Sequence, residues 1–134
     1  MRRALTTYEF VIDSHAWIEY FRGTEAGRAA RAYVEGDGAA TSTMTLANLR
    51  EKYAREHWAW FDQDLAFVTT RTQVVPLDRA LALMAGQLNY ERKSLVRGWG
   101  MADSVVLATA RSASAKVVTG DRHFEGLPDA IMLP

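Results

Sequence analysis

Three aspartates stand at places in the sequence from which a fold could bring them together. Asp13 directly follows a short apolar run, Asp121 comes soon after another, and Asp103 opens a helical pattern after a glycine-containing loop. Carboxylate oxygens suit Mg²⁺ or Mn²⁺, and clustered carboxylates repel one another unless a cation neutralises them. If these side chains meet, they predict a site for a divalent metal ion.

Helix capping is the simpler interpretation of the same residues. Aspartate is a favoured N-cap residue, and each of the three immediately precedes or opens a predicted helix. Asp78, at the start of a long helical pattern, is predicted to be a cap only. A shared position at one end of a sheet favours the metal site for the other three, because caps need not share an end.

The elements that must position these residues alternate along the chain. Apolar runs of strand length lie at 10–12, 39–41, 74–75, 116–118 and 131–133. Helical patterns lie at 16–21, 24–34, 45–53, 58–68, 77–95 and 101–110. This alternation predicts an α/β fold with a mostly parallel sheet of four to five strands, covered by helices on both faces. In such sheets ligands bind beyond the carboxyl ends of the strands, where Asp13 and Asp121 are expected.

Composition narrows the class of protein. With 134 residues and no cysteine, the chain is predicted to form one domain over 1–134, without disulfides, cysteine-bound zinc or a thiol nucleophile. No apolar run approaches the roughly 20 residues that span a bilayer, so we expect no membrane association and a cytoplasmic location. Sixteen basic residues balance sixteen acidic ones, so any nucleic-acid contact must depend on local patches of positive charge.

Four short blocks of sequence stand out as motifs. They are VIDS at 11–14, TLANL at 45–49, ADSVVLATA at 102–110 and TGDRHF at 119–124. In this order and spacing they resemble the PIN-domain family, particularly its VapC-type toxins. The resemblance implies a three-layer α/β/α PIN-like fold and an endoribonuclease that needs Mg²⁺ or Mn²⁺ to cut RNA. It also implies a cognate antitoxin protein in a type II toxin-antitoxin system, and frequent homodimer formation.

The resemblance also assigns the site. Asp13, Asp103 and Asp121 match the family's acidic positions, which makes them the expected metal ligands and catalytic acids. At the fourth position, usually glutamate, this sequence has Asn48, whose amide offers an oxygen but no negative charge. Glu51, three positions further along the helix and rotated by about 60°, is a candidate to replace the missing acid.

Two hydroxyl residues next to the acids are candidates for a supporting role. Ser14 and Thr119 are placed to orient a carboxylate or a bound water, although both are also ordinary cap and turn residues. The three histidines show no metal-ligand spacing, so no zinc site is predicted.

Basic and aromatic residues are candidates for RNA contacts. Arg92, Lys93 and Arg97 lead into Trp99 and would pair phosphates beside a stacking ring, or alternatively form the polar end of a helix beside a packed tryptophan. The aromatic residues at 58–61 are predicted to lie in the core or a dimer contact rather than to stack on bases.

Two other functions fit parts of the sequence. Because Asn48 lacks a charge, the chain is alternatively a catalytically weakened PIN-like module that binds RNA or a protein without efficient turnover. A flavodoxin-like phosphotransfer or receiver domain also places acids at strand ends, but the phosphate loop expected there is missing from the sequence.

Overall fold

The computed structural model describes residues 8–134 as alternating strands and helices. In chain order they are β1 (Phe10–Ile12), α1 (Ser14–Arg22), α2 (Glu25–Val34), β2 (Ala39–Ser42), α3 (Thr43–Glu56), α4 (Phe61–Arg71), β3 (Gln73–Val75), α5 (Arg79–Arg92), α6 (Met101–Arg111), β4 (Lys116–Thr119), the 3₁₀ turn η1 (Arg122–Phe124) and β5 (Ala130–Met132).

The five strands form one sheet in the order β3-β2-β1-β4-β5, and every pairing in it is parallel. The predicted parallel α/β sheet is therefore confirmed. β1 and β4 are neighbours, with Ile12 opposite Val118 in the register. Because both strands run the same way, the residues that follow them emerge side by side at the carboxyl edge of the sheet.

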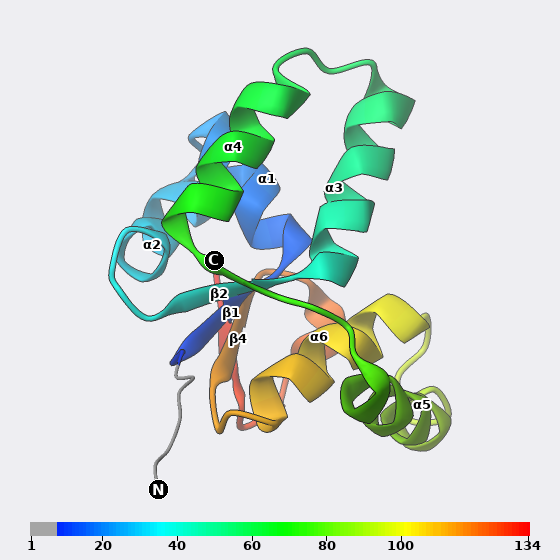
Figure 1. Cartoon of the computed structure of the whole chain (residues 1–134). Helices are drawn as coiled ribbons and strands as arrows, with labels where there is room; N and C mark the ends of the chain where they lie inside the picture. The colour runs from blue at the N-terminus through cyan, green and yellow to red at the C-terminus, as the bar shows by residue number, and fades with distance from the viewer. Residues whose placement is uncertain (1–7) are drawn as a thin grey trace, which may run out of the picture.

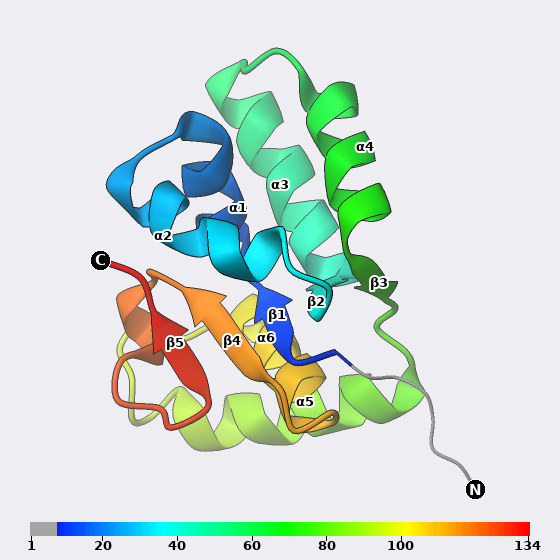
Figure 2. The same cartoon turned by 90° about the vertical axis from the view of Figure 1, so that its left-hand side faces the viewer.

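Helices cover both faces of the sheet and give three layers, α/β/α. Helices α1 to α4 lie on one face, and α5 and α6 lie on the other (Figures 1 and 2). Successive strand residues point to opposite faces. Val11 accordingly packs in the core cluster beneath α5 and α6, whereas Ile12 packs in the cluster that holds Trp17 of α1 and Val34 of α2.

Several helix starts differ from the sequence prediction by two or three residues, and those of α4 and α5 have identifiable causes. Helix α4 begins at Phe61 rather than near residue 58, because the chain first turns through His57 and Trp60, which both have left-handed backbone angles. Helix α5 begins at Arg79 rather than at 77, because Asp78 caps it by accepting a hydrogen bond from the Leu81 backbone N–H (2.9 Å). The predicted cap role of Asp78 is confirmed.

Among the described residues, the helices are all too short or too polar to cross a bilayer.

Candidate metal centre

Asp13 is a buried carboxylate at the junction of β1 and α1. Its side chain is the N-cap of α1, and the Ser14 backbone N–H donates to Oδ1 over 2.6 Å. The other carboxylate oxygen, Oδ2, accepts a hydrogen bond of 2.6 Å from the hydroxyl of Thr119, which ends the neighbouring strand β4. Only 7% of the residue is exposed. Asp13 is therefore a cap and at the same time part of a contact between two strand ends.

The surroundings of Asp13 raise its pKa from 3.8 to about 6. Burial is the largest cause, and the negative charges of Asp121 and Asp103 raise the pKa further. Hydrogen bonds from Thr119 and Ser14 oppose the rise but do not cancel it. Asp121 and Asp103 therefore lie close enough for their charges to act on Asp13, although burial has the larger effect.

Asp121 reaches this edge from the turn after β4. Its backbone N–H donates to the Thr119 hydroxyl oxygen (2.9 Å), and its carboxylate Oδ1 accepts from the His123 backbone N–H (2.9 Å). The Thr119 hydroxyl thus connects the Asp13 carboxylate to the backbone of Asp121. A threonine here has the geometry of a supporting residue as well as of an ordinary turn residue.

Asp103 enters from α6, on the opposite face of the sheet from α1. Its Oδ2 accepts from the Gly100 backbone N–H (3.1 Å), which closes the first turn of the helix. Burial is the main cause that raises the pKa of Asp103, and the Asp121 charge adds to it, while hydrogen bonds from Gly100 and His123 lower it. The charge of Asp121 therefore acts on Asp103 as it does on Asp13.

His123 joins the acids, although sequence spacing did not reveal it. Its Nδ1 lies 3.0 Å from Oδ2 of Asp103 and 3.6 Å from Oδ1 of Asp121. One ligand atom from each of these three residues lies within 4.8 Å of the other two, a separation that allows them to share one ion. Asp103 is twenty residues away in sequence, so no local motif contains the pair. The only indication in the sequence that His123 could join the acids was its position two residues after Asp121.

The donor set fits a divalent cation. Asp103 and Asp121 share the cluster with His123, and Asp13, which lies at the same edge of the sheet, is not part of it. Burial disfavours the charged forms of Asp13 and Asp103. A doubly charged ion would neutralise these charges, and carboxylate and imidazole groups are both common ligands of such ions. The arrangement can therefore hold a divalent ion.

Asn48 lines a cavity that reaches Ser14, the residue after Asp13. Together with Ser14, His15 and Glu51 it lines a cavity of about 360 Å³ between α1 and α3. The Glu51 side chain is 74% exposed and pairs with Arg55, with Nη1 and Oε2 separated by 3.7 Å. Glu51 thus shares the cavity with Asn48 but carries its charge toward Arg55.

The tryptophan proposed for RNA stacking is a core residue. Trp99 is 6% exposed, donates from its indole nitrogen to the Ser104 hydroxyl (2.7 Å), and packs against Phe124. The Arg92 guanidinium lies over its ring, 4.9 Å from the centroid. The alternative of a packed tryptophan beside a polar helix end is therefore correct, and a stacking role for Trp99 is wrong because its faces are covered.

The fold and the acidic edge together define a known class of protein. A family model described as the PIN domain matches residues 10–129, and the chain belongs to this family. No curated protein matches the sequence closely enough to count as a relative.

Solved structures of similar fold come from toxin-antitoxin systems. VapC20 of Mycobacterium tuberculosis, described as a toxin that cleaves the sarcin-ricin loop, superposes with a TM-score of 0.75 at 14% identity, over 94% of this chain and 100% of that one. A toxin-antitoxin complex from Klebsiella pneumoniae gives a TM-score of 0.74 at 19% identity, over 92% and 97%. The DNA-bound VapBC of Salmonella typhimurium gives 0.69 at 24% identity, over 94% and 97%. These likenesses establish that the chain has the fold of VapC proteins.

Proposed function

We propose that this protein is an endoribonuclease that uses Mg²⁺ or Mn²⁺ to hydrolyse RNA phosphodiester bonds, and that it is the toxin of a type II toxin-antitoxin pair. One observation carries the proposal: Asp13, Asp103 and Asp121 gather at one edge of the sheet, where burial and the charge of Asp121 disfavour the charged forms of Asp13 and Asp103. Membership of the PIN family and the VapC-like fold support the same activity.

The three acids have one shared part in the proposed site. Asp13, Asp103 and Asp121 would hold the ion, which when bound supplies Lewis acidity toward a phosphate oxygen and lowers the pKa of a coordinated water. The Thr119 hydroxyl fixes one oxygen of Asp13, and the Ser14 N–H fixes the other. These hydrogen bonds keep the carboxylate oriented in the absence of substrate, which reduces the reorganisation needed for catalysis.

The cavity beside the acids is the proposed path for single-stranded RNA. Ser14 lines this cavity, and so do the three cations Arg22, Lys52 and Arg55. These cations can pair with phosphates, and such contacts depend on salt rather than on base sequence. They would supply the local positive charge that the neutral overall composition lacks.

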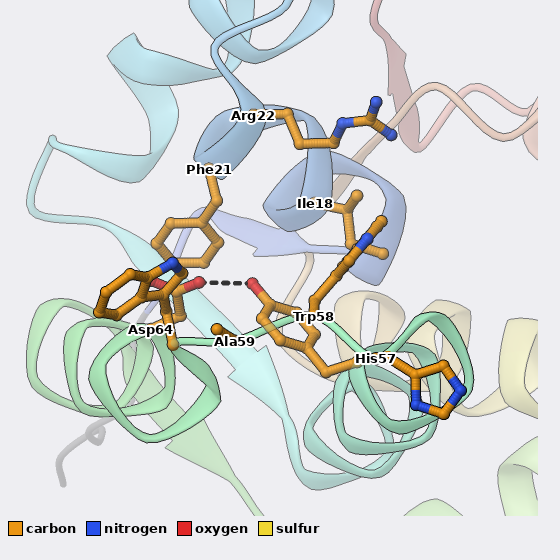
Figure 3. A pocket seen from close by; sticks show the side chains of 9 residues that line it. Ile18, Phe21, Arg22, His57, Trp58, Ala59 and Asp64 are labelled. Carbon is orange, nitrogen blue, oxygen red and sulfur yellow. Dashed lines mark hydrogen bonds between the residues drawn. The ribbon is translucent and has the colours of Figure 1, made fainter.

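A second cavity continues the first and is the proposed seat of an antitoxin segment. It measures about 400 Å³, and Ile18 and Arg22 line both cavities. Figure 3 shows Phe21, Trp58 and Asp64 around it, with the Asp64 carboxylate accepting a hydrogen bond of 2.6 Å from the Tyr53 hydroxyl. A peptide with apolar side chains fits this wall, and an arginine at its end would reach toward the carboxylates.

The proposed antitoxin can be checked in the genome. A short gene directly upstream that encodes a small DNA-binding protein is expected.

We also propose a homodimer, because Leu83 and Tyr90 of α5 and Leu95 beyond it are each more than 70% exposed, and exposed apolar patches commonly mark interfaces.

Cleavage of a labelled single-stranded RNA by the full chain in Mn²⁺ tests the proposed reaction. Products are expected with Mn²⁺, are expected to disappear with EDTA, and are expected to fall at least about 100-fold in Asp103→Asn. Asp78→Asn is the matched control, because it changes a cap remote from the acids and should leave cleavage unchanged. RNA binding without any product would instead support the alternative of a binding module weakened by Asn48.

A further inference from the structure

His123 contributes a nitrogen atom to a cluster that is otherwise made of carboxylate oxygens. Its Nδ1 faces Asp103 at 3.0 Å and Asp121 at 3.6 Å. The imidazole is one third exposed, so one side of the cluster is open to solvent and substrate. An ion shared by the three residues would therefore have mixed nitrogen and oxygen ligands.

The backbone on the far side of the ring holds it in this position. Gly98 has φ +84, and a Cβ at this residue would lie 2.9 Å from Nε2 of His123. Only a glycine leaves room for the ring there. The next residue, Phe124, is fully buried and packs against Trp99, with ring centroids 5.1 Å apart. The Gly98 backbone and the buried neighbour Phe124 thus hold the His123 ring against the carboxylates.

We infer that His123 is a ligand of the divalent ion, and that it gives this site a preference for Mn²⁺ and related transition-metal ions over Mg²⁺. The inference rests on the proposed metal-dependent function and specifies its cofactor. Imidazole nitrogen binds transition-metal ions well, whereas Mg²⁺ requires near-octahedral oxygen ligands. Asn48 adds no charge at the position where a glutamate is expected, which weakens a binding mode that depends on charge alone.

The chain offers a matched control for this role. His15 also lies near the acids, but its Nδ1 accepts a hydrogen bond of 3.2 Å from the Gly120 backbone N–H. That nitrogen is already engaged, so His15 is expected to stay outside the ligand set. His57, at the end of α3, lines the cavity beside Trp58 instead.

Pulsed electron paramagnetic resonance on Mn²⁺ bound to the metal-free full chain reports the ligand atoms directly. We expect nitrogen-14 coupling in the unmodified protein and in His15→Asn, and its loss in His123→Asn and His123→Gln. Calorimetric titration with MnCl₂ and MgCl₂ should show a Mn²⁺ affinity at least about tenfold weaker in both His123 variants, with a smaller change for Mg²⁺.

Mn²⁺ that is bound with oxygen ligands only, or with unchanged affinity in both His123 variants, overturns the inference. If those variants do not fold, the three histidines of the chain still permit an assignment by elimination. Nitrogen coupling retained in both His15→Asn and His57→Asn supports His123, and its loss in either one overturns the proposal.

The same samples separate this inference from the proposed function. Nitrogen coupling without RNA cleavage supports His123 as a ligand and overturns the ribonuclease. Cleavage with oxygen-only coupling keeps the ribonuclease and overturns the role of His123.

Discussion

At the scale of single residues, Asp13 carries an electrostatic cost that a metal would remove. Its pKa is raised, so the folded protein holds a proton on this carboxyl more tightly than the unfolded chain does. The stability associated with this group is therefore fully present below pH 3.8 and is lost as the pH rises through about 6. At pH 7.5 the buried charge corresponds to a cost of roughly 3 kcal/mol.

Asp13→Asn tests this directly. We expect the variant to be more stable than the unmodified protein at pH 7.5 without metal, by up to about 3 kcal/mol, because an amide carries no charge to bury. The difference should vanish below about pH 4, where the acid is protonated. Urea unfolding at both pH values measures it, with Asp78→Asn as a control that retains a good cap.

Adding Mn²⁺ should make the unmodified protein more stable than Asp13→Asn. A ligand that binds only the folded state stabilises it in proportion to its affinity, so the unmodified protein gains stability and Asp13→Asn gains little. Equal destabilisation of the variant at both pH values would mean that Asp13 acts only as a cap and hydrogen-bond acceptor.

Asn48 is the residue at which this chain departs from the expected set of acids. Asn48→Glu should lower the Mn²⁺ concentration needed for half-maximal RNA cleavage by roughly tenfold, because it adds a carboxylate beside Ser14 in the same cavity. Cleavage rates across a Mn²⁺ titration give the result. Glu51→Gln is the comparison: an increased metal requirement in that variant would identify Glu51 as the fourth acid.

The sequence was enough to predict some residues of the site but not others. The approach of Asp13 and Asp121 could be predicted because strand ends in a parallel sheet share an edge. For Asp103, at the start of a helix, the prediction depended on the motif order of the family. His123 was missed because it meets Asp103 through the tertiary fold, whereas ligand-spacing rules apply within one segment. The buried contact of Thr119 with Asp13 likewise depends on the β1 and β4 register.

At the scale of elements, strand and helix types were predictable and their ends were less so. Periodicity alone extended α4 back to residue 58, whereas Trp58 packs onto Tyr53 with centroids 5.4 Å apart and stays in the loop. An apolar residue that folds back onto the preceding helix has the same local pattern as one that starts the next helix. The boundary was therefore decided by a contact that the sequence does not reveal.

Two helical glycines are expected to respond in opposite ways to alanine. At Gly27 of α2, a Cβ would lie 1.9 Å from the Glu19 carbonyl oxygen, so α1 and α2 approach each other through their backbones. Gly27→Ala should destabilise the protein by about 3 kcal/mol or more, because backbone cannot move aside cheaply. At Gly86 of α5 a Cβ would meet nothing within 4 Å. Gly86→Ala should stabilise by about 0.5 to 1 kcal/mol through helix propensity.

Thermal and urea unfolding of these two variants provide the comparison. If both alanines destabilise, α5 has a neighbour in solution that the single chain lacks. If both stabilise, the close approach of α1 and α2 is looser than the structure gives it.

At the scale of the whole molecule, the three layers separate two kinds of surface. The face formed by α1 and α3 bears both cavities, and the first of them reaches Ser14 beside Asp13. The opposite face bears α5, which buries Leu81, Ala85 and Leu88 against the sheet and α6. A substrate or antitoxin on the first face and a second protomer on the second would not compete for the same residues.

The outward face of α5 supports the last prediction. Leu83 is 71% exposed and Tyr90 is 73% exposed, and their seven-residue spacing puts both on one side of the helix. Symmetric dimers bury the same patch from both chains, so two added lysines on this face would repel each other across the interface. The double variant Leu83→Lys, Tyr90→Lys should therefore elute as a monomer in size-exclusion chromatography with light scattering, whereas the unmodified protein should have twice the mass of one chain.

Two lysines at the exposed Ala32 and Ala66, on helices of the other face, add the same charge and should leave the dimer intact. If the unmodified protein is a monomer, or if the α5 variant is still a dimer, the outward face of α5 is not the dimer interface.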